Sequence, residues 1–150
     1  MAPLETRGTR VPIPRDLKHA VANAYSVIAR VARENYPYVR PELVHAQEFC
    51  REICRPVFNQ LTKRYGDSLR LMRYGDKNVT MHLFLAVMYK DKLWFLDPSW
   101  QQFLPLPDDS KPRELWVEAD KIVEKLREYG VSEERHHVWL DALPVPNSET

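Results

Sequence analysis

The chain has 150 residues, with 22 Lys and Arg against 21 Asp and Glu, and its formal net charge is +1. A nearly neutral chain has no overall positive field to hold a polyanion, so composition argues against nucleic acid and anionic membranes as partners. Hydrophobic residues make up 44% and charged residues 29% of the chain, which is typical of a globular protein. The length fits one domain.

No stretch of the sequence approaches the roughly 18 to 20 continuous apolar residues that a membrane-spanning helix needs. The N-terminus also lacks a charged start followed by an apolar run, which a secretory signal would show. We therefore expect a cytoplasmic protein. Two cysteines, Cys50 and Cys54, do not make a disulfide framework, and a reducing compartment would keep both as thiols.

The N-terminal residues are predicted to form a tail followed by a helix. Residues 1–14 contain three prolines and several charges without a sustained apolar period, which favours a flexible tail. We expect a single domain over residues 15–150. Its first element is an amphipathic helix from residue 15 to about Asn35, because apolar residues recur there at helical spacing.

A second helical region is predicted from Pro41 to a stop at Gly66. Pro56 lies inside this region, where a proline removes one backbone hydrogen bond and its ring clashes with the carbonyl four residues earlier. We therefore expect a kink, or two abutting helices, near residues 50–55.

Three short runs rich in Val, Leu, Phe, Tyr and Met follow, at residues 68–74, 79–89 and 93–97, and turn residues separate them. They are typical of strands in an antiparallel sheet. The middle run is apolar on both faces from residue 81 to residue 87, apart from His82. This pattern predicts a central strand that is covered on both sides.

The C-terminal part is predicted to add a helix and an edge strand. Pro112 marks the start of the helix, an apolar stripe follows it, and Gly130 lies where a left-handed cap would end it. Residues 138–140 indicate an edge strand. The predicted fold class is therefore α+β, with N-terminal helices packed on an antiparallel sheet.

Three residues carry the chemical signal: Cys50 near a helix start, His82 in an otherwise apolar strand, and Asp97 at the end of the next strand. If the hairpin between these strands turns at residues 90–91, Phe84 lies opposite Asp97. His82 is then a diagonal neighbour of Asp97 on the same face of the sheet. A three-residue turn would put the pair on opposite faces unless a bulge restored the phase.

These three residue types have a joint chemical use. A thiol is weakly nucleophilic until it ionises, and a helix N-terminus together with a neighbouring imidazolium favours ionisation. A carboxylate then holds the imidazole in the right tautomer and stabilises its charge. Cys50, His82 and Asp97 are therefore the candidate catalytic residues.

The segment Cys50-Arg51-Glu52-Ile53-Cys54 resembles the nucleophile helix of transglutaminase-like domains, a branch of the papain-type cysteine enzymes. The strand that begins at His82 and the phrase Leu96-Asp97-Pro98-Ser99 resemble the histidine strand and the aspartate-proline-hydroxyl signature of the same family. The resemblance covers about residues 49–103. The elements also follow one another in the family's order.

This resemblance implies a transglutaminase-like core and a Cys50-His82-Asp97 triad. The implied activity is acyl transfer or hydrolysis at an amide, of the glutamine deamidase, transglutaminase or peptidase type. The substrate would be a protein or peptide amide, and no cofactor is implied. The residues indicate neither the choice among these reactions nor the oligomeric state.

Two alternatives concern the cysteines. Cys54 is a second candidate nucleophile, because Pro56 would fit the first turn of a helix that begins at Cys54. The family usually has a glycine two residues before its cysteine, where this chain has Glu48. The chain could therefore keep the scaffold as a protein-binding module with silent thiols.

Two further hypotheses concern other side chains. A metal site would draw on ligand types at His45, Cys50, Cys54, His136 and His137, but their spacing in the chain is poor for zinc. Gln47 is of the right type for an oxyanion donor. Neither hypothesis is supported by a specific motif.

Overall fold

The computed structural model describes residues 11–46, 49–105 and 111–149. The α-helices are α2 (Arg15–Asn35), α3 (Cys50–Tyr65), α4 (Ile122–Glu128) and α5 (His137–Leu140). The strands are β1 (Leu69–Gly75), β2 (Thr80–Tyr89), β3 (Lys92–Asp97), β4 (Leu115–Glu118) and β5 (Leu143–Pro144). Short 3₁₀ helices include η1 (Pro41–Ala46) and η3 (Trp100–Phe103).

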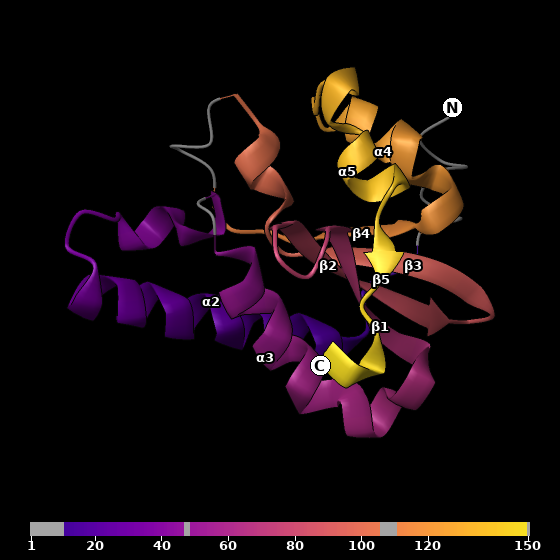
Figure 1. The fold of residues 1–150 in the computed structure, drawn as a ribbon, viewed down its shortest axis with the longest axis horizontal. Coiled ribbons are helices and arrows are strands. Elements are labelled where there is room, and N and C mark those ends of the chain that lie inside the picture. Colours follow the sequence, from indigo (N-terminus) through magenta and orange to yellow (C-terminus); the bar gives the residue numbers. More distant parts are fainter. Residues whose placement is uncertain (1–10, 47–48, 106–110, 150) are drawn as a thin grey trace.

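The strands of the described chain form one five-stranded sheet in the order β4-β3-β2-β1-β5, and each neighbouring pair is antiparallel. Helices α2 and α3 lie on one side of the sheet, and α4 and α5 lie on the other (Figure 1). The fold is therefore α+β, as the alternation of helical and strand periods predicted. No described helix has the length and apolarity needed to cross a membrane.

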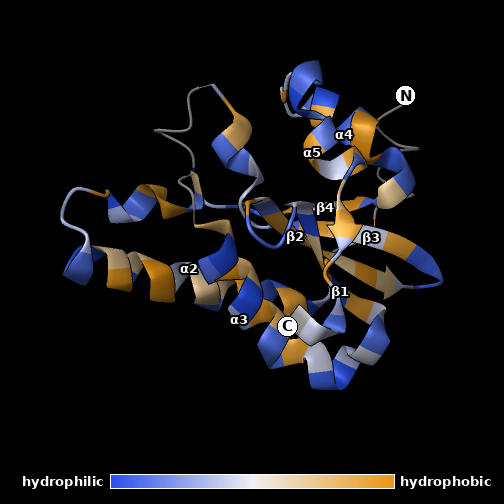
Figure 2. Ribbon diagram, in the orientation of Figure 1, coloured by the Kyte–Doolittle hydropathy of each residue, from blue (hydrophilic) through white to orange (hydrophobic). Residues whose placement is uncertain are grey.

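The first core lies between the sheet and helices α2 and α3. Buried residues recur along α2 at helical spacing. Hydrophobic and hydrophilic residues alternate along α2 and α3 (Figure 2). The sheet contributes the odd-numbered positions of β1 and β2 to this core, among them Leu69, Leu71, Leu83, Leu85 and Val87. Ile53, Cys54 and Val57 of α3 pack on them.

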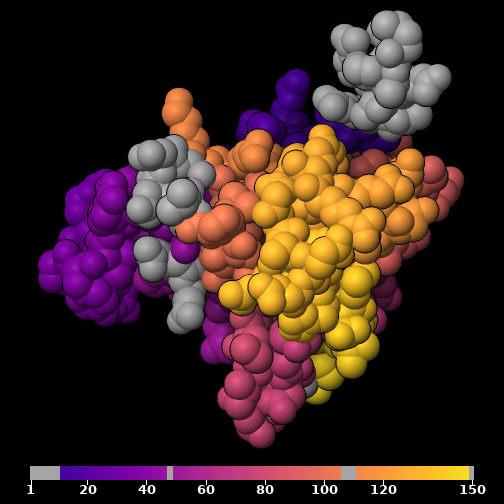
Figure 3. All heavy atoms as spheres, turned by 90° about the horizontal axis from the view of Figure 1, so that it is seen from above, coloured from indigo at the N-terminus to yellow at the C-terminus, as the bar shows by residue number. Residues whose placement is uncertain are grey.

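The second core lies on the opposite face of the sheet. It contains the even-numbered positions Phe84 and Ala86 of β2, together with Leu126 of α4 and Trp139 of α5. The orange and yellow C-terminal residues form a continuous surface in the space-filling view (Figure 3). Because both faces are covered, residues 83–87 of β2 are all buried, which confirms the predicted central strand.

The N-terminal elements agree closely with the sequence analysis. Helix α2 spans residues 15–35, as predicted. Residues 11–14 of the predicted tail are described, and the carbonyl of Val11 accepts a hydrogen bond from Trp116 Nε1 at 2.9 Å. Residues 1–10 lie outside the described residues.

The second helical region is divided, but earlier than Pro56. Helix α3 begins at Cys50 and continues through Pro56 to Tyr65. The preceding residues 41–46 form the separate 3₁₀ helix η1. The break predicted at residues 50–55 was therefore placed too late, because packing of α3 against β1 and β2 keeps the helix continuous past the proline.

Two secondary-structure predictions for the C-terminal part were wrong. Residues 115–118, predicted as helical, form strand β4, because Leu115 and Val117 alternate with half-buried neighbours and pair with β3. The helix is shorter and begins at Ile122. Residues 138–140, predicted as a strand, belong to helix α5, and the edge strand is β5. Gly130 does follow α4 in the left-handed region, with φ 84°.

Candidate active site

The hairpin of β2 and β3 brings His82 and Asp97 together. It turns at Lys90 and Asp91, both with positive φ, and pairs Tyr89 with Lys92. Pairing continues in the same register to Leu85 opposite Leu96. His82 and Asp97 therefore share one face of the sheet, and His82 Nε2 lies 2.6 Å from Asp97 Oδ2. Both side chains are fully buried.

Asp97 is held by two further donors. Trp139 Nε1 donates to Oδ2 over 2.7 Å, and the backbone N–H of Ser99 donates to Oδ1 over 2.9 Å. A buried carboxylate needs such donors, because it has no water to accept from. Together they fix the carboxylate with one oxygen directed at the imidazole.

Aromatic rings surround the imidazole of His82. Phe84 stacks on it with ring centroids 5.9 Å apart, while Phe103 and Trp139 meet it edge-on at 5.0 and 5.8 Å. The second ring nitrogen, Nδ1, lies 3.0 Å from the side-chain amide nitrogen of Gln102. The ring is therefore fixed by packing on its faces and by polar contacts at both nitrogens.

The charge state of His82 is decided by two opposed effects. Burial alone would lower the pKa of the imidazole, because a low-dielectric site disfavours the cation. The negative charge of Asp97 and its hydrogen bond, with a further contribution from the nearby Cys50, raise the pKa of His82 to about 9. The site therefore favours an imidazolium near neutral pH.

Cys50 lies at the first position of α3 and is half-buried. Its side chain lies close enough to the imidazole to contribute to the raised pKa of His82. The unpaired backbone N–H groups of the first turn and the positive end of the helix dipole both stabilise negative charge at this position. A half-buried cysteine, an imidazole and a buried carboxylate thus lie near one another.

Cys54 occupies a different environment one turn later. It is fully buried, and its Sγ donates to the backbone carbonyl of Leu83 over 3.4 Å. Burial raises the pKa of the Cys54 thiol well above its ordinary value, and the nearby charge of Asp97 raises it further. A buried, protonated thiol is a poor nucleophile, so the geometry favours Cys50 over Cys54.

The histidines of the rival metal hypothesis have other contacts. His136 is buried and donates from Nε2 to the carbonyl of Val131 at 3.0 Å, and His137 packs edge-on against Tyr74 at 5.0 Å. His45 is buried beside the ring of Tyr25. Among the described residues, no three His, Cys, Asp or Glu side chains are grouped to hold a metal ion. Gln47 lies outside the described residues.

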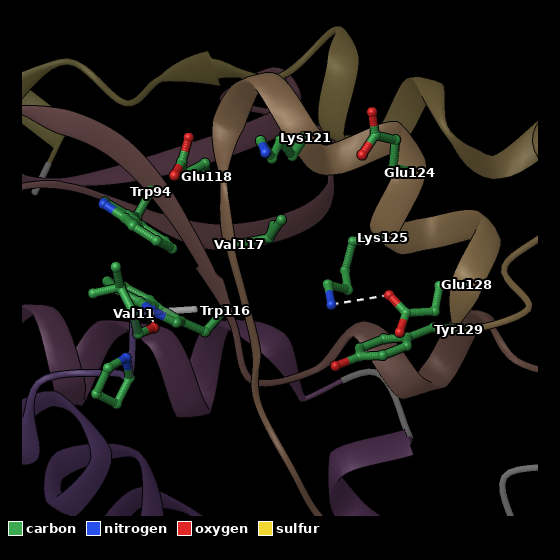
Figure 4. Close-up of a pocket in the computed structure, with 11 residues that line it drawn as sticks. Val11, Trp94, Trp116, Val117, Glu118, Lys121, Glu124, Lys125, Glu128 and Tyr129 are labelled. Atoms are coloured by element: carbon green, nitrogen blue, oxygen red, sulfur yellow. Dashed lines mark hydrogen bonds and ion pairs between the residues drawn. The ribbon is translucent and has the colours of Figure 1, made fainter. Parts of the chain in front are cut away.

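A pocket of about 720 Å³ lies away from Cys50, His82 and Asp97 (Figure 4). Its walls come from β3, β4, α4 and residues 11–12, and its stacked Trp94 and Trp116 rings are 4.7 Å apart. Lys125 and Glu128 form an ion pair of 2.9 Å at its rim. Charged groups of both signs line it, so it shows no preference for an anionic or a cationic ligand.

The sequence analysis missed two residues of the site, Gln102 and Trp139. A weak signal existed for Gln102, which lies five residues after Asp97 in a segment, Trp100–Phe103, that begins and ends with an aromatic residue. Trp139 had no such signal, because it lies 42 residues from Asp97 and was predicted to belong to a strand.

Comparisons of the chain with protein-family models, curated proteins and solved structures found no match.

Proposed function

We propose that this chain is a cysteine-dependent acyltransferase or hydrolase that acts on amides, with Cys50 as nucleophile, His82 as base and acid, and Asp97 as the orienting carboxylate. The observation that supports the proposal is the 2.6 Å contact of His82 with the buried Asp97, next to a half-buried Cys50 at a helix start that contributes to the raised pKa of His82. The resemblance to transglutaminase-like enzymes around residues 49–103 adds support. The transglutaminase-like core is part of the same proposal.

The first half-reaction follows from these contacts. The thiol proton passes to His82, and the electron pair left on sulfur attacks the amide carbonyl carbon. The carbonyl π electrons move to oxygen and form a tetrahedral oxyanion. The C–N bond then breaks, the imidazolium gives its proton to the departing nitrogen, and an amine or ammonia leaves.

The second half-reaction regenerates the thiol. Water or another amine loses a proton to His82 and attacks the acyl-thioester carbonyl. The C–S bond breaks, and the sulfur recovers the proton from His82. Water as acceptor gives hydrolysis or deamidation, and an amine gives transamidation. The substrate is accordingly a protein or peptide amide, and the proposed chemistry requires no cofactor.

Asp97 orients the His82 ring in both half-reactions. With Asp97 Oδ2 accepting from Nε2, the neutral imidazole has its lone pair on Nδ1, which is the nitrogen available for a thiol proton. The carboxylate also stabilises the imidazolium after transfer.

The proposal is tested by alkylating the protein with iodoacetamide between about pH 5 and pH 9 and locating each modified cysteine by peptide mass. We expect Cys50 to react quickly at acid pH, and at least about tenfold more slowly in His82→Ala. Cys54 should stay slow in both proteins. The exposed His19 of α2 supplies the control, because His19→Ala should leave the Cys50 rate unchanged.

A second candidate function is a protein-binding module that keeps this scaffold with silent thiols. The complete burial of His82 is the observation that favours it. Two uniformly slow thiols, insensitive to His82→Ala in a variant that remains folded by circular dichroism, would contradict the enzyme and support the binding module. A fast Cys50 would instead justify a screen for ammonia or amine release from peptide amides.

A further inference from the structure

We propose that Gln102 is a positioning residue whose amide N–H donates to His82 Nδ1 and so restrains proton transfer from Cys50 in the free protein. The consequence of this hydrogen bond for catalysis rests on the proposed function. The effect of Gln102 on the pKa of His82 does not, because that effect can be measured on the imidazole itself.

The first step of the argument is the tautomer of His82. Asp97 Oδ2 lies 2.6 Å from Nε2, and a carboxylate accepts, so Nε2 carries a hydrogen. In the neutral ring Nδ1 therefore has the lone pair. Gln102 Nε2 lies 3.0 Å from Nδ1, and an amide nitrogen can only donate. The two partners thus select one tautomer from opposite sides of the ring.

The second step is that η3 holds Gln102 in place. Trp100 is fully buried, and its indole donates to the carbonyl of Arg113 over 3.0 Å. Gln101 is also buried, and its amide bridges the carbonyl of Lys111 at 3.0 Å and the N–H of Arg113 at 3.1 Å. With its neighbours tied to the chain before β4, the half-buried Gln102 side chain is directed at His82.

The third step is that the Gln102 amide and the Cys50 proton compete for the lone pair on His82 Nδ1. The titratable groups that face His82 are Asp97 from β3 and Cys50 from α3, and the other contacts, Phe84, Phe103 and Trp139, are uncharged. When the S–H bond of Cys50 breaks, its proton must go to Nδ1. Nδ1 then becomes a donor, and the hydrogen bond from Gln102 is lost. Gln102 therefore stabilises the neutral thiol and imidazole relative to the thiolate and imidazolium.

The test is Gln102→Met, which keeps the length of the side chain and removes the donor. Losing one neutral hydrogen bond should raise the titration midpoint of His82 by about half to one pH unit, a 3- to 10-fold change. Ring ¹⁵N chemical shifts of the folded protein measure the midpoint between about pH 6 and pH 10.5 and identify the protonated nitrogen.

The control is Gln60→Met, the same change at an exposed position of α3, which should alter neither readout. An unchanged His82 midpoint in Gln102→Met would overturn the proposal. A lower midpoint would also overturn it, because the amide would then offer its oxygen to an Nδ1–H group. If Cys50 is slow and insensitive to His82→Ala, the proposed function fails, and the ¹⁵N titration still decides the role of Gln102.

Discussion

Trp139 donates its indole N–H to Asp97 Oδ2 over 2.7 Å, and the same carboxylate oxygen lies 2.6 Å from His82 Nε2. This contact connects helix α5, near the end of the chain, to the β2-β3 hairpin. The two donors converge on one oxygen from different elements. The C-terminal elements are therefore part of the support of the candidate site as well as a cover for the sheet.

Replacing Trp139 with Phe should test this support. The change keeps an aromatic ring and removes a donor to a buried carboxylate, so we expect the free energy of unfolding to fall by about 1.5 to 3 kcal/mol. Urea denaturation measures it. Trp116→Phe is the matched control, because its half-buried indole donates to the neutral carbonyl of Val11 and should cost only about 1 kcal/mol. Equal losses in the two variants would contradict the special role of Trp139.

The raised pKa of His82 predicts a pH dependence of stability. The folded-state pKa of about 9 exceeds the ordinary value of 6.5, so this stabilisation is fully present below about pH 6.5 and is lost as pH rises through 9. The free energy of unfolding should fall by on the order of 3 kcal/mol across this window. Urea denaturation at a series of pH values checks the slope.

Asp97→Asn is the control for that slope, since it removes the charge that raises the pKa of His82. The variant should be less stable below pH 6.5 and show a much flatter profile up to pH 9. Above pH 9 the buried Cys54 thiol, with its raised pKa, adds a loss in the same direction, so the comparison stops there. A slope that persists in Asp97→Asn would assign the pH dependence to another group.

The two cysteines should respond differently to truncation. Cys54 is fully buried, so Cys54→Ala leaves a small cavity and removes the thiol donor to the Leu83 carbonyl, and we expect a loss of about 1 to 2 kcal/mol. Cys50 is half-buried at the helix start, and Cys50→Ala should cost under about 1 kcal/mol. Thermal or urea unfolding gives both values. A larger loss at Cys50 would indicate that its thiol is mainly structural.

The β2-β3 turn offers a test of the register that brings His82 to Asp97. Asp91 has a φ of 64°, in the left-handed region, so Asp91→Gly should stabilise the protein by about 0.5 kcal/mol. Asp91→Val should destabilise it by about 1 to 2 kcal/mol, because a β-branched side chain is strained there. Unfolding midpoints in urea compare the variants, and equal stability of Gly and Val at this position would be inconsistent with the observed turn.

Local patterns predicted the part of the site that lies on neighbouring strands. The apolar run around His82 indicated a central strand, and a two-residue turn predicted a diagonal pairing with Asp97, because side chains alternate strictly along a strand. The structure has this turn and this contact. The same reasoning did not reach Gln102 or Trp139, whose positions depend on segments without a clear period.

The incorrect secondary-structure predictions had a common physical cause. Leu115, Ile122 and Leu126 fit a helical stripe, yet the first of them belongs to β4, where the vacant edge of β3 provides hydrogen-bond partners that no local propensity reports. Pro56 suggested a break, yet burial of Ile53 and Val57 on the sheet keeps α3 continuous. In each case a tertiary contact outweighed a local preference.

By itself the sequence determined the α+β class, the helix at residues 15–35 and the three central strands, because these follow from apolar period. It predicted the pairing of His82 with Asp97 only on the condition of a two-residue turn. Only the tertiary structure decided that Cys50 is half-buried near His82 while Cys54 is fully buried, and that Gln102 and Trp139 complete the polar contacts. Which of two thiols one turn apart reaches an imidazole depends on how α3 lies across the sheet, and that orientation is set by packing between distant segments.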